Sequence, residues 1–335
     1  MKKYIVLFVS LCVLLMLSAC GKEKNNSNSN VNPGTENRVE VDVQQGENAG
    51  DAEDANGFFN EEFGEYFLDG ITYKLDDATK TVTASGVYSL EITDVVMPDV
   101  IAYNGTDYKV TSAAESLFAY QEMLTGVKLP AGLQEIPASM FYGCDNLTQV
   151  TIPEGVKAIG DNAFTQCFSL TKLTLPESLE TIGDEAFFAC EMLQKVVIPD
   201  NVKEIGTAAF YDCSLLMSVT LSKNLKAIPD EAFGNCVCLK EIVIPEGIKE
   251  IGFEVFWGCG ALKSIVIPDS VALIGSRCFY DCAALQEVTL PVALAEVDKE
   301  MFAYCEALKT IYAPESLGEE LNALFVLDEV KIVTR

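Results

Sequence analysis

The feature that most constrains the fold is a cysteine that recurs every 23 residues, eight times in succession, without an insertion or deletion. A phenylalanine precedes each cysteine by three residues, and a proline follows each by nine except where Ser222 replaces it. The eight cysteines are Cys144, Cys167, Cys190, Cys213, Cys236, Cys259, Cys282 and Cys305. Such a period is typical of a solenoid, whose repeats bury their apolar side chains against one another. The pattern therefore predicts a repeat scaffold and argues against a compact enzyme.

One repeat, Leu170–Met192, illustrates the expected rung. Its leucines alternate with polar residues up to a proline, which predicts a short strand over Lys172–Leu175. A second extended segment ends at Gly183, where a tight turn favours a residue without a side chain. Asp184 follows at a position suited to an N-cap, and Glu185–Phe187 fits one turn of helix. We expect the phenylalanine and the cysteine of each repeat to point inward from this turn.

The repeat reads Leu-x-x-Ile-x-Ile-Pro, then Val/Leu-x-x-Ile-Gly, then Ala-Phe-x-x-Cys, and it is carried by Leu147–Cys167 and its successors. In this pattern the chain resembles the leucine-rich repeat superfamily, and closely its 23-residue BspA-like (Treponema-type) class, over about residues 110–314. The resemblance implies a leucine-rich repeat solenoid, a right-handed coil of short parallel strands and short helical turns. It also implies a bacterial, often surface-exposed protein that binds other proteins or host components.

The segments that flank the repeats read as caps. Asn104-Gly105 predicts the turn of a β-hairpin, and a degenerate first repeat carries Gln121 at the cysteine position. After the last repeat, Glu315–Leu324 reads as a short helix and Val330–Val333 as a closing strand. The expected segments are a lipoprotein signal peptide at 1–19, a disordered tether at 20–57, an N-terminal β-rich cap at 58–112, leucine-rich repeats at 113–314 and a C-terminal helix-strand cap at 315–335.

The first twenty residues have the pattern of a targeting segment. Two lysines precede the apolar run Ile5–Leu17, which has the length of a signal peptide. Leu17-Ser18-Ala19-Cys20 resembles the lipobox of bacterial lipoproteins, and the resemblance implies cleavage before Cys20 and attachment of diacylglycerol to its sulfur. The alternative is an ordinary signal peptide or an anchor helix with a chance cysteine. The polar residues that follow are too poor in apolar side chains to fold, so we expect a flexible tether of roughly 30–35 Å.

Charge and composition exclude several functions. The net charge is −27, from 50 acidic and 23 basic residues, and such a surface repels nucleic acid and anionic lipid. The chain has no histidine, which removes the commonest general base and metal ligand. No nucleophile elbow or phosphate-binding loop is present, and no βαβ halves frame a cleft as in a solute-binding protein. We therefore expect no catalytic residues, no metal and no cofactor.

We expect the recurring cysteines to be small packing residues. Neighbouring side chains in a parallel stack lie about 4.8 Å apart and do not converge, which suits neither a disulfide nor a zinc site. A column of buried, unreactive thiols beside the phenylalanine column is the favoured interpretation. Cys238, which stands outside the period, is the cysteine with the best prospect of being reactive.

The side chains that the repeat does not bury form three candidate surfaces. The first is the exposed face of the strands before each proline, where either a partner binds or β-branched residues merely satisfy strand propensity. A second row consists of the mostly acidic residues that follow each proline. These residues either bind cations or a basic partner, or they form a solvated edge. A third row contains aromatic residues that are either half-buried staples or a weaker contact patch, with Trp257 as the best single contact. The strand-face candidates are Gln149, Thr151, Lys172, Thr174, Lys195, Val197, Ser218, Thr220, Glu241, Val243 and Tyr312, and the aromatic candidates are Tyr211, Trp257 and Tyr280.

These expectations combine into two functional hypotheses. In the first, the protein is an extracytoplasmic lipoprotein, anchored to the membrane through Cys20 and displayed on the surface of a bacterium, that binds a protein or extracellular-matrix ligand. In the second, it is a structural or self-associating element of the cell envelope without an external ligand. Concentration-dependent association without any ligand would favour the second hypothesis.

Overall fold

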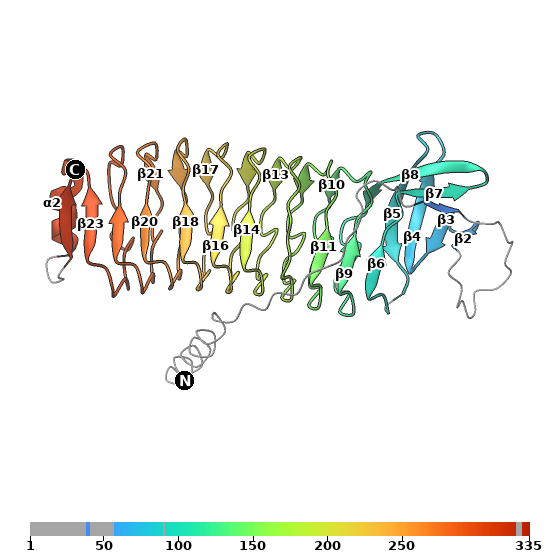
Figure 1. The fold of residues 1–335 in the computed structure, drawn as a ribbon, viewed down its shortest axis with the longest axis horizontal. Helices are drawn as coiled ribbons and strands as arrows, with labels where there is room; N and C mark the ends of the chain where they lie inside the picture. The colour runs from blue at the N-terminus through green and yellow to red at the C-terminus, as the bar shows by residue number, and fades with distance from the viewer. Residues whose placement is uncertain (1–37, 41–56, 90, 326–329) are drawn as a thin grey trace, which may run out of the picture. The chain divides into compact units, whose positions relative to one another are not determined.

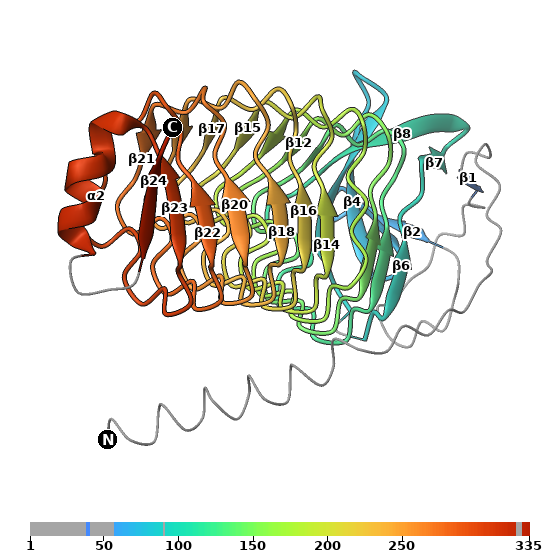
Figure 2. The same cartoon turned by 60° about the vertical axis from the view of Figure 1, so that its left-hand side comes forward.

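The computed structural model describes residues 38–40, 57–89, 91–325 and 330–335. From residue 94 onward, apart from an inserted antiparallel hairpin at residues 100–113, the chain coils through successive rungs whose short strands pair in parallel (Figure 1; Figure 2). The predicted solenoid is therefore confirmed, and each rung contributes to three stacked faces. We call them the strand face, the second sheet and the turn side.

The strand face contains the strand that precedes the proline of each repeat. Five of these strands, β6, β11, β14, β18 and β20, bury the middle residue and expose the two on either side, as in the pattern of Glu241–Val243. Its strands are β6 (Asp94–Val96), β9 (Gly126–Lys128), β11 (Gln149–Thr151), β14 (Lys195–Val197), β16 (Ser218–Thr220), β18 (Glu241–Val243), β20 (Ser264–Val266), β22 (Glu287–Thr289), β23 (Thr310–Ala313) and β24 (Lys331–Thr334).

The second sheet contains two-residue strands that end in a buried isoleucine. These strands are β10 (Glu135–Ile136), β12 (Ala158–Ile159), β13 (Thr181–Ile182), β15 (Glu204–Ile205), β17 (Ala227–Ile228), β19 (Glu250–Ile251) and β21 (Leu273–Ile274). After most of them a glycine donates its N–H to the isoleucine of the preceding rung, as Gly183 does to Ile159 at 2.8 Å. A Cβ on Gly206 would lie 2.3 Å from the backbone nitrogen of Asp184, so this close approach requires glycine.

The turn side differs from the predicted turn of helix. Asn162 and Gln166 have positive φ angles of 56° and 61°, and Glu185 has 53°, so the backbone cannot continue as a right-handed helix. The left-handed residues instead aim their N–H groups along the stack, as Asn162 does toward the carbonyl of Asp184 at 2.8 Å. Phe164 donates likewise to Ala186 at 2.8 Å, which makes the turn side a third inter-rung ladder.

The prediction that Asp184 caps its own turn is also wrong, because its carboxylate bonds to a different rung. The Asp184 carboxylate accepts the backbone N–H of Thr207 in the next rung at 2.7 Å, rather than an N–H of its own turn. Asp161 accepts from Asp184 in the same way at 2.9 Å. Since no helix follows in this rung, the carboxylates bond along the stack and not along the chain.

The phenylalanines form one internal file, as the period predicts. From Phe118 to Phe302 each ring stacks on the next, with centroids 5.0–6.1 Å apart and interplanar angles of 5–14°. These are offset-stacked distances, which add to the energy of burying the rings. The file keeps the same 23-residue spacing without interruption from Phe118 to Phe302, so each rung places one ring in it.

The cysteines form a second file beside the phenylalanines, and each thiol has a partner. Every thiol of the series donates to the carbonyl of the phenylalanine 26 residues earlier, at Sγ···O distances of 2.9–3.3 Å. All of the series except Cys305 are fully buried, and so is Cys278. Burial raises the pKa of these thiols, to about 12 for Cys144 and Cys259. A small residue with a weak donor fits this position, and the packing interpretation is confirmed for these side chains.

Three interruptions divide the ladders, and two have a visible cause. The strand expected at Lys172–Leu175 is absent, and only a bridge from Lys172 to Gln149 remains. Leu173 replaces the Val or Ile found at the middle of the other strands, and it is less well buried than they are. Pro229 occupies the position after β17 where most rungs have glycine. Because proline has no N–H, it cannot donate to the preceding rung, and β17 is not paired with β15. β18 and β20 also belong to separate sheets.

The N-terminal part is a seven-stranded mixed sheet in the order β1-β7-β8-β5-β4-β3-β2. The expected hairpin is present, with Asn104 and Gly105 at φ angles of 49° and 73°. One rung was not anticipated, because β6 pairs with β9 although the hairpin is inserted between them. The strands of this sheet are β1 (Arg38–Glu40), β2 (Phe58–Asn60), β3 (Glu65–Leu68), β4 (Ile71–Asp76), β5 (Thr81–Val87), β7 (Val100–Tyr103) and β8 (Thr106–Ala113).

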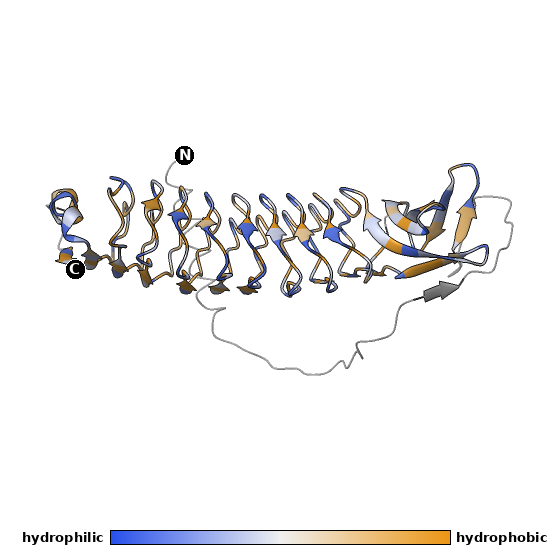
Figure 3. Cartoon of the chain, turned by 90° about the horizontal axis from the view of Figure 1, so that it is seen from above, coloured by the Kyte–Doolittle hydropathy of each residue, from blue (hydrophilic) through white to orange (hydrophobic). Residues whose placement is uncertain are grey.

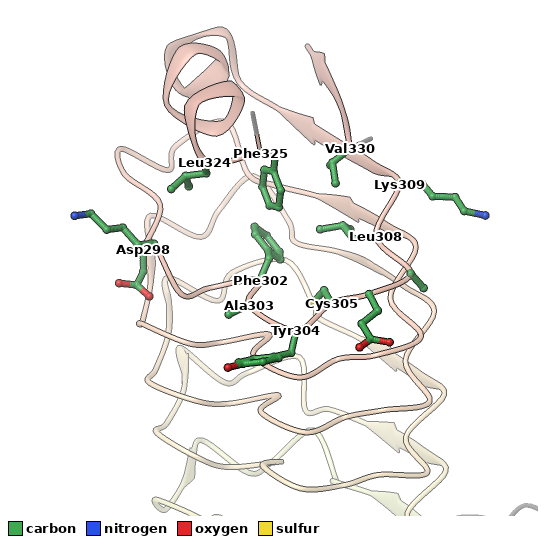
Figure 4. Close-up of a pocket in the computed structure, with 13 residues that line it drawn as sticks. Asp298, Phe302, Ala303, Tyr304, Cys305, Leu308, Lys309, Leu324, Phe325 and Val330 are labelled. Carbon is green, nitrogen blue, oxygen red and sulfur yellow. The ribbon is translucent and has the colours of Figure 1, made fainter. Parts of the chain in front are cut away.

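The C-terminal end is an altered rung. η1 (Glu315–Leu317) and α2 (Gly318–Leu324) replace the extended segments, and β24 closes the strand face beside β23. Phe325 stands 23 residues after Phe302, but its ring tilts by 46° at a centroid distance of 6.3 Å. A cavity of about 770 Å³ opens at this break in the stack, with Phe302, Leu308 and Phe325 in its lining (Figure 4). The cavity lies at the C-terminal end of the phenylalanine file.

Candidate functional site

The strand face presents the candidate residues as two parallel columns. The inter-rung register places Val197 beside Thr220 and Thr220 beside Val243, while Lys195, Ser218 and Glu241 form the second column. Nine of the eleven candidates are exposed, and Ser218 and Tyr312 are half-buried. Thr174 lies in the same series without belonging to a strand, because its rung lacks one. The structure therefore brings the candidates onto one face.

Three neighbouring valines stand out on this face, and Val96 on β6, near its N-terminal end, is a fourth exposed valine. Val197, Val243 and Val266 are 51%, 77% and 66% exposed, although valine is among the residues most often buried. Val243 and Val266 lie on β18 and β20, the adjacent strands that belong to separate sheets. Thr220 lies between Val197 and Val243, so the row has methyl groups throughout. Figure 3 shows apolar colour alternating with polar colour along the rungs. Single exposed valines are ordinary, but an aligned row of them is a candidate contact surface.

The acidic row after the prolines has a structural role that neither interpretation included. The carboxylate of Asp200 accepts the backbone N–H of Lys223 in the next rung at 3.1 Å, and this hydrogen bond lowers the pKa of Asp200. Asp269 accepts from Val292 at 3.1 Å and pairs with Arg335 at 2.6 Å, and the contact with Arg335 is the main cause of its lowered pKa. These carboxylates satisfy backbone donors at the rim of the stack.

The aromatic row lies on the turn side and stacks on itself. Phe188 and Tyr211 are parallel at a centroid distance of 5.3 Å, and Tyr211 is parallel to Trp257 at 6.3 Å. The last pair is two rungs apart, and the glycine between them makes the contact possible. A Cβ on Gly234 would lie 2.7 Å from the Tyr211 ring. Tyr280 contacts Tyr304 instead, at 5.0 Å. The candidates Tyr211, Trp257 and Tyr280 are half-buried.

The remaining predictions concern Cys238, metals and the membrane. Cys238 is half-buried, unlike the fully buried members of the thiol file. Among the described residues, no group of three His, Cys, Asp or Glu side chains is placed to hold a metal ion. In the same part of the chain, no helix has the length and apolar character needed to cross a bilayer. The lipobox with Cys20 lies outside the described residues.

Comparison with known proteins identifies the repeat. A family model described as BspA type leucine rich repeat region matches residues 111–237 and 204–326, which together span more than half of the chain. The chain belongs to this family. The matched residues include the rungs that carry the strand-face candidates. A comparison with curated proteins found no match.

Solved structures agree with the BspA-type assignment. The crystal structure of a leucine rich repeat protein from T. pallidum is 33% identical, with a TM-score of 0.53, and the alignment covers 58% of this chain and 88% of that one. A leucine rich cell surface protein from Faecalibacterium prausnitzii is 23% identical, with a TM-score of 0.50, and the alignment covers 81% of this chain and 94% of that one. The second likeness concerns the fold alone.

Proposed function

We propose that this BspA-type protein is a lipid-anchored, surface-displayed binding protein whose strand face docks a protein or matrix partner. The observation that carries the proposal is the row of exposed valines at 197, 243 and 266 on the strand face. Apolar side chains flanked by polar ones, here Lys195 and Glu241, match the composition of protein interfaces. The lipobox at Leu17–Cys20 supports anchoring, and the description of the F. prausnitzii protein supports surface display.

One observation favours the self-associating scaffold as the second candidate. In the part of the chain that the structure describes, β24 pairs only with β23, which leaves its other edge free for another strand. Sedimentation of the purified chain over a hundredfold concentration range distinguishes the two functions. The scaffold requires association without a ligand, whereas the binding protein requires a partner.

Two valine substitutions test the strand-face proposal. Val243→Asp with Val266→Asp places carboxylates in the apolar row, and burying them against a partner is costly, so we expect affinity to fall at least tenfold. The partner is first isolated from envelope or host-cell extract by cross-linking to the full mature chain, and its affinity for each variant is then measured by interferometry.

Leu273→Asp with Ala272→Asp is the matched control for this experiment, because it adds the same two carboxylates at exposed positions. Leu273 is 50% exposed and lies on β21 of the second sheet, so the same kind of change is made on a different face. Equal weakening by both sets of variants would reflect net charge alone, and unchanged binding by the valine variant would remove the strand face from the interface. Either result rejects the proposed site.

A further inference from the structure

On the turn side, one arginine is held between carboxylates of the two neighbouring rungs. The Arg277 guanidinium contacts Glu254 at 3.4 Å and also pairs with Glu300 on the opposite side. Its carbon Cζ lies 5.9 Å from the centroid of the Tyr280 ring, in a cation–π arrangement. The arginine thus bridges acidic side chains that are two rungs apart and covers an aromatic ring three residues after itself.

Three rungs earlier, the two acidic positions and the tyrosine recur, but alanine stands in place of the arginine. Ala208 stands 69 residues before Arg277, three times the period, and Tyr211 follows it by three residues as Tyr280 follows Arg277. Glu185 and Glu231 occupy the neighbouring rungs. The φ angles of Glu185 and Ala208, 53° and 52°, match those of Glu254 and Arg277, 52° and 55°. Glu231 has a left-handed φ of 57°, whereas its equivalent Glu300 does not have a positive φ. Alanine has no group that could bridge the two carboxylates.

The charged groups around Glu231 and Tyr211 also favour a cation between the two carboxylates. The pKa of Glu231 is raised by partial burial and then by the carboxylates of Glu254, Asp230 and Glu185. The pKa of Tyr211 is raised by burial and then by Glu231, Asp212 and Glu254. Every charged group that acts on these two side chains is therefore another acid. A cation placed between Glu185 and Glu231 would relieve this repulsion, as Arg277 does between Glu254 and Glu300.

We propose that the notch formed by Glu185, Ala208, Tyr211 and Glu231 receives an arginine side chain from a protein partner. The inference rests on the proposed function for the nature of the partner, and it adds a second contact on the turn side. An acidic cluster alone would not indicate a ligand. Here the occupied copy at Arg277 shows the ligand's chemistry within the same molecule. Arginine is favoured over lysine because its planar fork has donors for both carboxylates and a face for the ring.

The test uses a defined probe instead of the natural partner. Acetyl-Gly-Arg-Gly-amide is titrated into the full chain, with binding followed by the fluorescence of Trp257, which stacks on Tyr211. The same peptide with citrulline, which keeps the shape and removes the charge, is the control ligand. We expect saturable binding of the arginine peptide and at least tenfold weaker binding of the citrulline peptide.

Three variants locate the binding. Ala208→Arg fills the notch from within, and its backbone angle is one that Arg277 already adopts, so the fold should tolerate it. Glu185→Gln with Glu231→Gln removes both charges. Both variants are expected to bind at least tenfold more weakly. Ala272→Arg adds the same charge at an exposed position beside β21 and is expected to bind like the unmodified chain.

Two outcomes would overturn the inference. One is equal weakening by Ala208→Arg and Ala272→Arg, which would assign the binding to net charge. The other is the absence of saturable binding by the unmodified chain. The strand-face variant at Val243 and Val266 should bind the probe normally, so a failure of the notch and a failure of the strand-face site give different results.

Discussion

Raising the pH from 8 to 10 is expected to unfold the repeats, because eight buried thiols ionise only when the chain unfolds. Seven members of the thiol file and Cys278 are fully buried, and burial raises the pKa of each above its ordinary value of 9.0. Below pH 9 both states keep these protons, so the full stability is present. Above pH 9 only the unfolded state loses them, so stability falls as the pH rises.

The expected effect is large because the thiols act together. At pH 10, one unit above the ordinary value, each buried thiol favours the unfolded state by about 1.4 kcal/mol, and eight do so by about 11 kcal/mol. This is comparable with the whole stability of a typical domain, about 5–15 kcal/mol. The measurement is the urea midpoint at pH 8, 9 and 10 with reductant present, followed by circular dichroism.

A cysteine substitution serves as the internal control for the pH effect. Cys213→Ser keeps a small side chain with a donor for the carbonyl of Phe187 but removes one ionisable group. The dependence of stability on pH should weaken by about one eighth, whatever the variant's stability at pH 8. A urea midpoint that does not change between pH 8 and 10 would contradict the burial of the thiol file.

Phe210→Ala is expected to destabilise the fold by about 3–5 kcal/mol, the usual loss for a buried phenylalanine. The Phe210 ring is fully buried between Phe187 and Phe233, at centroid distances of 5.1 and 5.7 Å. Because each repeat contacts only its neighbours, two interfaces weaken at once and unfolding should separate into two steps. Differential scanning calorimetry measures both the loss and the number of transitions.

Phe188→Ala is the matched control, since it removes the same side chain from the half-buried aromatic row. Among the residues that the structure describes, Phe188 stacks on Tyr211 alone, and a pair of this kind contributes about 0.5–1.5 kcal/mol beyond burial. The loss should therefore be clearly smaller, and the single transition should persist. Equal losses from the two substitutions would mean that the internal file does not hold the rungs together.

The 23-residue period was enough to predict which residues stack on one another. The left-handed backbone angles of the turn side could not be predicted from it. Spacing alone places Phe164, Phe187 and Phe210 in one file, because stacked rungs bring equivalent residues together. The left-handed angles at Asn162 and Glu185 were not anticipated, since neither residue is glycine and both are compatible with a helix. The third ladder exists because each rung's N–H groups find carbonyls in the next, which a single repeat cannot reveal.

Irregular rungs limited the prediction in other places. Met97-Pro98 after β6 repeats the end of a rung, but the β7–β8 hairpin changes the spacing and hides it. Phe325 keeps the period and could have been found by counting from Phe302. The strand-face candidates follow from alternation within each strand. The notch at Ala208 could not be recognised before the role of Arg277 was visible, because its ligands come from three different rungs.

The central claim is that each 23-residue repeat is one rung, so that equivalent residues are spaced evenly along the strand face. Nitroxide labels on cysteines introduced at Lys128, Thr220 and Val266 test it by pulsed electron resonance, with the half-buried Cys238 and Cys305 replaced by serine, since the other thiols of the file are buried. Four rungs separate the first pair and six separate Lys128 from Val266, which at about 4.8 Å each gives roughly 19 and 29 Å. Mean distances near these values, in a ratio of about two to three, are predicted. A Lys128–Val266 distance no longer than the Lys128–Thr220 distance would contradict the stack.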